Sequence, residues 1–319
     1  MSIQFDGKKI TVFGGSGFIG KHLINKLSKY NCSIEIVTRK STNNKELKFL
    51  GGIGQIDVIV SNNFEENHLQ ELIKNSDIVI NLIGILYEKK NQRFEDIHSH
   101  IPKILARVSK KMGVKKFIHL SSLGIDKNLH SKYALSKLDG EKNIRSEFHD
   151  SLIYRPSVVF GDNDSFINLF SEIANYSPIM PVIGTPVIDF DKRILPKFKF
   201  TDGVKFQPIY VGDLVEFILK TSSKKEKTYD LAGPNIVSFK EIMQLILITK
   251  KKKRILLPVP LVMARFMSFF MEKLPKPILT SDQVILLKND NVSKTGFENL
   301  KKEINFPKSL EIIIPTYIK

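Results

Sequence analysis

The first half of the chain alternates short apolar runs with amphipathic stretches. Runs of mostly branched apolar residues are separated by segments in which apolar residues recur every three or four positions. This alternation predicts parallel strands joined by helices that cover both faces of one sheet. The predicted strands are 9–13, 33–38, 56–60, 77–82, 116–120 and 151–154, and the predicted helices include 65–74, 94–112 and 130–148.

A glycine-rich turn follows the first of these strands. Gly14, Gly17 and Gly20 are spaced three apart, and apolar residues then recur at helical spacing from Phe18 to Leu27. In a strand–turn–helix unit one glycine permits the tight turn, one lets the backbone approach a pyrophosphate, and one lets the helix pack on the strand. The helix start adds unpaired N–H groups and a positive dipole end. The turn therefore predicts a dinucleotide site made by Gly14, Gly15, Ser16, Gly17, Phe18, Ile19 and Gly20.

These elements predict an α/β fold built on a Rossmann-type, doubly wound parallel sheet. Crossovers between parallel strands are right-handed, and ligands of such sheets bind at the carboxyl ends of the strands. A chain of 319 residues is near the size at which a single core divides. We therefore expect a smaller unit beside the dinucleotide-binding domain.

The end of the second predicted strand favours NADP(H) over NAD(H). NAD-binding folds place an acidic residue about 20 positions after the glycines, where it binds ribose hydroxyls. Here the sequence is Thr38-Arg39-Lys40. A guanidinium offers a 2′-phosphate a planar, paired hydrogen-bonding face, whereas a carboxylate would repel it. We predict NADP(H) with Arg39 at the phosphate; NAD(H), with Arg39 as a surface cation, is the alternative.

Two later strand ends extend the predicted cofactor site. Asn81 and Gly84 follow the fourth strand, where a glycine lets the backbone pass close to a ribose. Asn62 and Asn63 end the third strand and could contact an adenine. Ordinary turn residues would give the same pattern at these two positions.

The residues best suited to chemistry follow the fifth predicted strand. Ser121 and Ser122 end that strand, and Tyr133 and Lys137 stand four apart on the next helix, hence on one helix face. We expect the nearby ammonium to lower the phenol pKa from its usual value of about 10. The lysine can also hold the nicotinamide ribose while a serine hydroxyl holds a substrate oxygen. The arrangement predicts a general acid or base beside a hydride carrier.

The composition adds a strong positive charge. The chain has 49 Lys and Arg against 33 Asp and Glu, a formal net charge of +16, which suits nucleic acid, an anionic membrane surface or acidic substrates. The lysines are scattered rather than grouped with aromatic residues, so we interpret most of the charge as solvated surface and expect no nucleic-acid partner.

The cysteine count and the N-terminal pattern indicate a compartment. Cys32 is the only cysteine, which rules out an intramolecular disulfide and suits a reducing compartment. The first predicted strand begins within about ten residues of the start, so we expect no cleavable leader. Together these observations predict a cytoplasmic protein.

One apolar stretch near the C-terminus follows a basic run. Residues 250–254 read KKKKR, and 255–271 form the most apolar stretch, interrupted by two prolines and an arginine. It is shorter than the roughly 20 residues of a membrane span. We interpret Leu261–Met271 as a buried helix that closes a substrate cleft, because a helix that is apolar all round is usually buried. Docking on an anionic membrane or a membrane-bound partner is the alternative.

The histidines and one aspartate receive structural interpretations. His98, His100 and His119 lack ligand-like spacing with carboxylates or with the cysteine, so we expect no metal site. Asp213 precedes an apolar helical run and is expected to cap that helix at its N-terminus.

Several of these motifs together resemble an extended or atypical short-chain dehydrogenase/reductase. They are the glycine turn, Asn81-x-x-Gly84, Ser121-Ser122, Tyr133-x-x-x-Lys137 and Tyr154-Arg155-Pro156-Ser157. Within that superfamily the chain is similar to the family of the NAD(P)H-binding A9 accessory subunit of respiratory complex I and its bacterial relatives. The segments that carry this similarity are 81–84, 94–98, 113–119, 140–141, 160–162, 207–213, 231–234 and 279–284.

The resemblance implies roles for particular residues. Tyr133 and Lys137 would act at the ribose and the reaction centre. Ser122 would supply a catalytic hydroxyl, with Ser121 as the close alternative, and Pro156 would line the nicotinamide pocket.

The resemblance also implies a domain division. The dinucleotide-binding domain would span residues 1–164, with 205–235 returning to it, and a smaller, mostly helical substrate or partner domain would comprise 165–204 and 236–319. Residues 185–205 look longer than the usual connection in this family.

Two classes of function follow. The retained Tyr133, Lys137 and serine pair favour an NADP(H)-dependent oxidoreductase that acts on a small-molecule substrate. The resemblance by itself favours a binding or assembly protein that associates with complex I, lies peripherally at the respiratory membrane and holds NADPH as a structural ligand. Two further alternatives remain. One is a role in ubiquinone biosynthesis or handling, and the other is a sugar-nucleotide epimerase or dehydratase activity.

Overall fold

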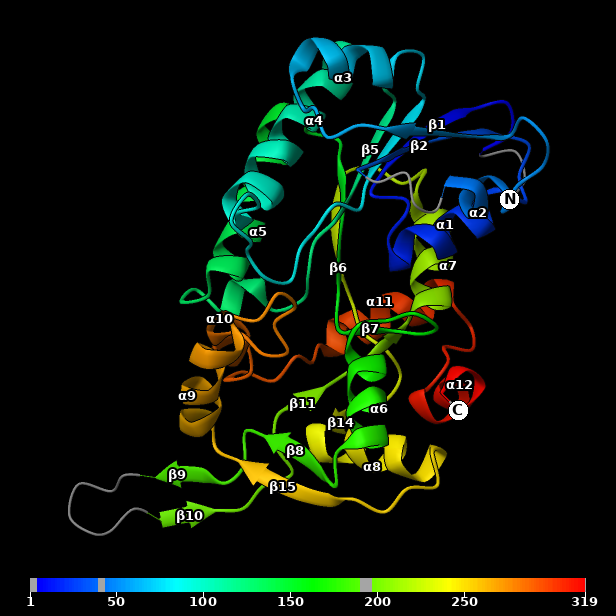
Figure 1. Cartoon of the computed structure of the whole chain (residues 1–319). Coiled ribbons are helices and arrows are strands. Elements are labelled where there is room, and N and C mark those ends of the chain that lie inside the picture. Colours follow the sequence, from blue (N-terminus) through cyan, green and yellow to red (C-terminus); the bar gives the residue numbers. More distant parts are fainter. Residues whose placement is uncertain (1–4, 40–43, 190–196, 319) are drawn as a thin grey trace.

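A seven-stranded parallel sheet forms the centre of the protein (Figure 1). The computed structural model describes residues 5–39, 44–189 and 197–318. The strand order is β13-β6-β5-β4-β1-β2-β3, which confirms the predicted doubly wound Rossmann-type fold. The strands are β1 (Lys9–Phe13), β2 (Ser33–Thr38), β3 (Ile56–Val60), β4 (Ile78–Asn81), β5 (Lys116–Leu120), β6 (Leu152–Pro156) and β13 (Lys227–Leu231).

Helices cover both faces of this sheet (Figure 1). One face carries α1 (Phe18–Leu27) and α7 (Val211–Thr221), and the other carries α3 (Glu66–Ile73), α4 (Ile101–Lys111) and α5 (Lys132–Glu147). Alternate residues of β1 serve the two faces: Ile10 and Val12 pack toward α1, and Phe13 packs toward α4. This double burial explains why the strands read as continuous apolar runs.

Short elements lie in three of the connections. The predicted helix at 94–112 consists of a π-helical turn, η2 (Asp96–His100), followed by α4, and a 3-10 turn, η3 (Ile125–Lys127), precedes α5. A short helix, α2 (Asn44–Lys48), precedes β3. The π-turn matters below because it carries His98 toward the candidate site.

A second cluster of core residues lies beyond the carboxyl ends of the sheet. It includes Phe160, Phe170, Met180, Phe239 and Ile314, all buried. The residue ranges proposed for two domains remain a prediction. The elements around this cluster are β7 (Val159–Phe160), α6 (Phe166–Tyr176), β8 (Ile179–Ile183), β11 (Lys205–Phe206), β12 (Ile209–Tyr210), β14 (Val237–Ser238), α8 (Phe239–Thr249), β15 (Ile255–Val259), α9 (Leu261–Met271), α10 (Ser281–Leu286) and α12 (Leu310–Tyr317).

Three further elements complete the description of the fold. The strands β9 (Val187–Asp189) and β10 (Lys197–Lys199) pair antiparallel, and the segment between them, with Asp191, Lys192 and Arg193, lies outside the described residues. The helix α11 (Lys294–Glu303) packs on β13.

The interpretation of Leu261–Met271 as a buried helix is wrong. Only Ala264 and Ser268 are buried in α9, and Phe266 is 69% exposed. The small side chains of this helix face the protein, so its large apolar side chains are left outside. Among the described residues, no helix has both the length and the apolar character that crossing a membrane requires.

Asp213 is also placed differently from the prediction. Tyr210 is the N-cap of α7, and Asp213 lies inside the first turn, where its carboxylate accepts a hydrogen bond from the backbone N–H of Lys308 at 2.6 Å. Burial raises the pKa of Asp213 to about 6. This residue ties the C-terminal segment to α7 instead of capping the helix.

Candidate functional site

The glycine turn packs too tightly for side chains. Gly14 has φ +79°, and a Cβ there would lie 3.1 Å from the backbone of Leu82 and Ile83. A Cβ on Gly20 would lie 2.5 Å from the carbonyl oxygen of Gly15. Gly14 thus lets the turn approach the segment after β4, and Gly20 lets α1 begin directly against the turn.

The start of α1 faces this turn without a side-chain cap. Gly17 is the N-cap residue and cannot supply one, and among the described residues no other side chain caps the helix. The Ser16 hydroxyl pairs with the Thr38 hydroxyl at 2.7 Å, which ties the turn to the end of β2. Phe18 and Ile19 open the helix and pack partly buried on the core. The uncapped N–H groups are suited to an anionic group such as a phosphate.

The residues predicted near the adenosine lie at the edge of the described structure. Arg39 directly follows β2 and has an exposed side chain, and Lys40 lies outside the described residues. Asn62 is exposed after β3. The Asn63 Oδ1 atom accepts a hydrogen bond from the backbone N–H of Glu65 at 2.8 Å, so Asn63 forms the turn before α3.

Asn81 and Gly84 have different surroundings. The buried Asn81 amide makes two hydrogen bonds, one with His119 Nδ1 at 3.1 Å and one from the Ile83 N–H at 3.0 Å, so it shapes the strand end. A Cβ on Gly84 would lie 3.6 Å from Lys137 Nζ and 3.8 Å from His98 Nε2. Gly84 therefore lies next to Lys137, one of the candidate catalytic residues.

Tyr133, Ser122 and Lys137 meet at the carboxyl end of β5. The Ser122 side chain hydrogen-bonds the Tyr133 phenol. The buried Lys137 ammonium donates to the Leu120 carbonyl at 3.1 Å, directly before the serine pair. Ser121 is buried, and its hydroxyl has no partner among the described residues. The catalytic roles expected for these residues remain predictions.

The expected lowering of the Tyr133 pKa is wrong. Burial raises the pKa of Tyr133, the Asp282 carboxylate raises it further, and the hydrogen bond with Ser122 opposes both effects. Burial also lowers the pKa of Lys137 to about 8. Desolvation disfavours the charged form of each group, and it is the largest cause of both shifts. Tyr133 is therefore a protonated phenol at neutral pH.

An aromatic box holds the Tyr133 ring. His98 and Phe94 stack with centroids 5.3 Å apart, and both meet Tyr133 nearly edge-on, at 5.2 and 5.6 Å. His98 Nε2 accepts from the Ile85 N–H at 3.1 Å, so its Nδ1–H faces the Ser136 hydroxyl at 3.0 Å. Burial lowers the pKa of His98 to about 2. This neutral histidine positions the tyrosine.

The π-turn explains how His98 reaches this position. The backbone of η2 crosses α5 so closely that a Cβ on Gly140 would lie 1.8 Å from the carbonyl oxygen of His98. Turns of this kind often occur at functional sites. Segments 94–98 and 140–141 carry the family resemblance, but sequence patterns alone assign no role at this site to His98 or Gly140.

A carboxylate from the C-terminal part caps the helix of Tyr133. Asp282 Oδ2 accepts from the Ser131 hydroxyl at 2.7 Å and from the Tyr133 N–H at 3.2 Å, and its Oδ1 accepts from the Lys132 N–H at 2.7 Å. Asp282 lies about 150 residues away in the chain. Sequence periodicity carries no signal for such a contact.

Two buried polar atoms lie on the same face of the sheet as Lys137. His119 Nε2 and Ser121 Oγ have no hydrogen-bond partner among the described residues. Burial and the Lys137 charge lower the pKa of His119, so its ring is neutral. Pro156, predicted to line the pocket, is buried at the end of β6, and its carbonyl accepts from the Leu123 N–H at 2.9 Å. It thus lies beside the segment that carries the serine pair.

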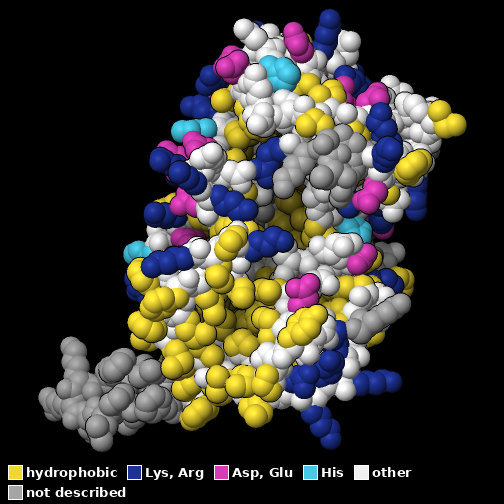
Figure 2. All heavy atoms as spheres, in the orientation of Figure 1, with side chains coloured by type: hydrophobic (Ala, Val, Ile, Leu, Met, Phe, Trp, Pro, Cys, Tyr) yellow, Lys and Arg dark blue, Asp and Glu magenta, His cyan; other side chains and the backbone are white. Residues whose placement is uncertain are grey.

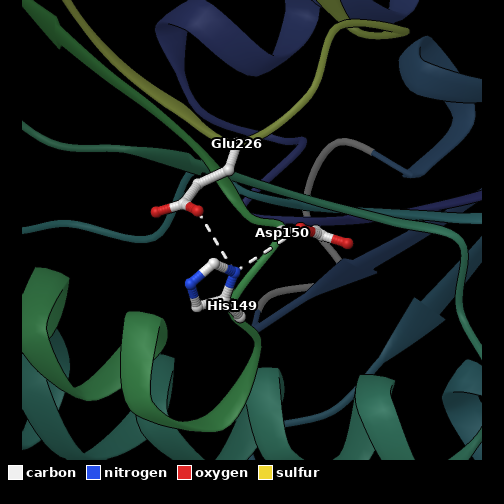
Figure 3. A group of neighbouring side chains, drawn as sticks. All are labelled: His149, Asp150 and Glu226. Carbon is white, nitrogen blue, oxygen red and sulfur yellow. Dashed lines mark ion pairs between the residues drawn. The ribbon is translucent and has the colours of Figure 1, made fainter.

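Figure 3 shows a separate group of one histidine and two carboxylates. His149 Nδ1 is 3.1 Å from Glu226 Oε2 and 3.5 Å from Asp150 Oδ1, and all three residues are exposed. Glu226 also pairs with Arg145 at 3.4 Å. We interpret the group as surface ion pairs. It includes none of the three histidines considered from the sequence.

Comparison with known proteins identifies relatives of this chain. Residues 6–161 match the NmrA-like family. The mouse mitochondrial protein NADH dehydrogenase [ubiquinone] 1 alpha subcomplex subunit 9 is 30% identical over 311 residues, which cover 96% of this chain and 78% of the mouse protein.

Solved structures share the fold at low sequence identity. An NADPH-dependent quinone oxidoreductase of Escherichia coli, complexed with NADPH, has a TM-score of 0.73 at 15% identity over 97% of this chain and 100% of its own. A UDP-glucose 4-epimerase of Thermotoga maritima, with UDP-glucose, has a TM-score of 0.69 at 16% identity over 97% of both chains. With this fold, and with the mouse protein's identity over most of both chains, the chain belongs to the family of the alpha subcomplex subunit 9 of NADH dehydrogenase [ubiquinone], the A9 subunit of complex I.

Proposed function

We propose that this chain is an NADP(H)-dependent oxidoreductase in which Tyr133 donates a proton to a small carbonyl or quinone-type substrate. The observation that carries the proposal is the grouping of Tyr133, Ser122 and Lys137 at the carboxyl end of β5. In doubly wound sheets ligands bind at this edge. A protein that only assembles with others does not need a buried lysine one helical turn from a partly buried tyrosine.

The surrounding residues fit a dinucleotide. The positive φ of Gly14 and the uncapped start of α1 suit a pyrophosphate. Gly84 leaves space beside Lys137, and Arg39 is exposed at the end of β2, where it can reach a 2′-phosphate. When bound, the reduced dinucleotide would supply a hydride.

The chemistry of the protein side chains follows from their protonation states. In a carbonyl reduction the carbonyl carbon gains the hydride and the oxygen gains a proton, so the C=O π bond is replaced by C–H and O–H bonds. The raised pKa of Tyr133 keeps its phenol protonated and ready to donate. The Ser122 hydroxyl is placed to orient the substrate oxygen. The Lys137 ammonium stabilises the phenolate left after donation, because it stands one helical turn away.

Family membership favours a second candidate function. The mouse relative is named as a subunit of NADH dehydrogenase [ubiquinone]. In this second function the chain associates with complex I at the cytoplasmic side of the respiratory membrane. Its nucleotide is then a structural ligand. A protein of quinone biosynthesis is a variant of this view. The likeness to an epimerase concerns the fold alone.

The decisive experiment measures nucleotide exchange and turnover. Purified protein is loaded with NADPH, and oxidation of the NADPH is followed after quinone or carbonyl compounds are added. The wild type is compared with Tyr133→Phe and with the control Tyr176→Phe, whose ring is 90% exposed. We expect Tyr133→Phe to reduce turnover by roughly two orders of magnitude or more. Non-exchanging NADPH together with an unchanged Tyr133→Phe variant would favour the structural role.

The cofactor preference is tested by a charge reversal at one position. Arg39→Asp should lower the affinity for NADPH by roughly tenfold to a hundredfold, since a charge-assisted contact to the 2′-phosphate is lost. The affinity for NADH should change much less. Lys29→Asp, at an exposed position after α1, controls for the net charge change. Equal losses for both nucleotides in calorimetric titrations would contradict the preference for NADP(H).

A further inference from the structure

The helix α9 presents its large apolar side chains to the outside. Five of them are between 54% and 69% exposed, whereas the small Ala264 and Ser268 are fully buried. A surface helix of a soluble protein normally has the opposite arrangement. The exposed residues are Val262, Met263, Phe266, Phe269 and Phe270.

The orientation of α9 is fixed by its contact with the next helix. The Ser268 hydroxyl pairs with the Ser281 hydroxyl of α10 at 3.1 Å. Glu272, just after α9, accepts a hydrogen bond from the Ser281 N–H. Turning the aromatic side inward would bury three phenylalanines where only an alanine and a serine fit, so the exposed side is a constant feature of this fold.

The apolar surface continues beyond the helix. Ile255 and Leu257 of β15 are 67% and 45% exposed, and Ile179 of β8, the register partner of Ile255, is 39% exposed. Figure 2 shows hydrophobic side chains gathered in a yellow area at the lower left, where α9, β15 and β8 lie in Figure 1. We call this surface the α9 face. Contiguous exposed apolar areas of this kind mark interaction sites.

Basic residues are frequent in the chain segment that forms the α9 face. Residues 250–279 contain eight lysines and arginines and a single acidic residue, Glu272, which is engaged with Ser281. Lys273 Nζ lies 4.7 Å from the centroid of the Phe269 ring. Arg265 is exposed on α9 itself. Lys273 therefore lies beside the aromatic rings, and Arg265 lies on the same helix.

We propose that the α9 face docks on the surface of an anionic lipid bilayer. Phe266, Phe269 and Phe270 would enter the boundary between headgroups and acyl chains, and Lys273 with its neighbouring cations would meet the lipid phosphates. A protein partner fits this surface less well, because lysine is depleted from protein interfaces. The proposal gives the peripheral membrane location suggested above a specific surface and a lipid chemistry, and it does not depend on catalysis.

Vesicle co-flotation of the full chain tests the proposal. The wild type is mixed at low salt with vesicles of pure phosphatidylcholine or of phosphatidylcholine with phosphatidylglycerol. We expect flotation with the anionic vesicles only, lost on adding salt because the charges are screened. Phe266→Glu/Phe270→Glu should lower the bound fraction by roughly tenfold or more, since two rings leave the lipid. Lys273→Glu/Lys276→Glu should lower it several-fold.

Matched variants and a folding check keep the outcome interpretable. Phe306→Glu, at a position that is 81% exposed, and Lys301→Glu, exposed on α11, should float like the wild type. NADPH binding is measured for the wild type and each variant. A variant that binds NADPH like the wild type has an intact fold. A wild type that does not bind NADPH would count against the proposed function and not against membrane docking.

Several results would overturn the proposal. The wild type could float with neither kind of vesicle, or equally with both kinds. The Phe266→Glu/Phe270→Glu variant could float as well as the wild type. A wild-type dimer in light scattering that this variant converts to a monomer would assign the α9 face to a second copy of the chain.

Discussion

The Asp282 carboxylate accepts a hydrogen bond from the backbone N–H of Tyr133 at 3.2 Å and binds the two preceding residues as well. One side chain of α10 thus caps the helix that carries the candidate proton donor. A carboxylate at a helix start also interacts favourably with the helix dipole. The position of Tyr133 consequently depends on the C-terminal part of the chain.

The first prediction concerns this cap. Asp282→Ala should lower the free energy of unfolding by about 1–2 kcal/mol, the usual cost of losing a helix cap. Asp282→Asn keeps an acceptor but removes the charge, so it should lower the pKa of Tyr133, which the carboxylate raises. The Tyr133 resonance in an NMR titration, assigned with Tyr133→Phe, reports that pKa. Glu298→Gln, an exposed position on α11, serves as the control, and an unmoved resonance in Asp282→Asn would contradict the expected charge effect.

The second prediction concerns acid stability. Burial lowers the pKa of His98 to about 2, so between that value and its usual 6.5 the unfolded chain binds the proton that the folded chain excludes. Stability should therefore fall as the pH drops below about 6.5. His98→Gln, which cannot take up a proton, should show a weaker dependence, and His119 should account for part of what remains. Urea unfolding at several pH values tests this; equal slopes for both proteins would contradict it.

The third prediction concerns the pH dependence of nucleotide binding. The pKa of Lys137 is lowered to about 8, so its ammonium is present below that pH and is lost above it. If the ammonium holds the nicotinamide ribose, NADPH affinity should fall as the pH rises through 8. Calorimetric titrations on either side of that pH measure the change. Lys137→Met should bind weakly at all of these pH values; a wild-type affinity that is flat through pH 8 would argue against this contact.

The fourth prediction concerns the crossing of α5 and η2. Gly140→Ala would place its Cβ 1.8 Å from the His98 carbonyl oxygen, so the π-turn must shift. We expect a loss of stability of about 1–3 kcal/mol, as for overpacked cores, with weaker activity because His98 supports Tyr133. Gly52→Ala, whose Cβ would meet only the Gln55 side chain at 3.8 Å, should be close to neutral. Equal thermal midpoints for the two variants would show that the backbones can separate.

The sequence by itself determined the sheet and the glycine turn. Their signals are local: apolar runs, a glycine spacing and a helical repeat all lie within a few tens of residues, because each strand is buried on both faces and each glycine meets its own neighbouring elements. The spacing of Tyr133 and Lys137 likewise follows from helix geometry. The local sequence could not predict the direction of the Tyr133 pKa shift, because the burial that raises this pKa comes from surrounding elements.

Only the tertiary structure decided which residues support the tyrosine and which way α9 faces. His98 reaches Tyr133 because a π-turn crosses α5 at Gly140, and Asp282 reaches it from about 150 residues away. The amino-acid pattern of α9 is apolar on all sides, so burial and exposure were equally compatible with it. Packing of the small Ala264 and Ser268 against the protein settled the matter and left the phenylalanines outside.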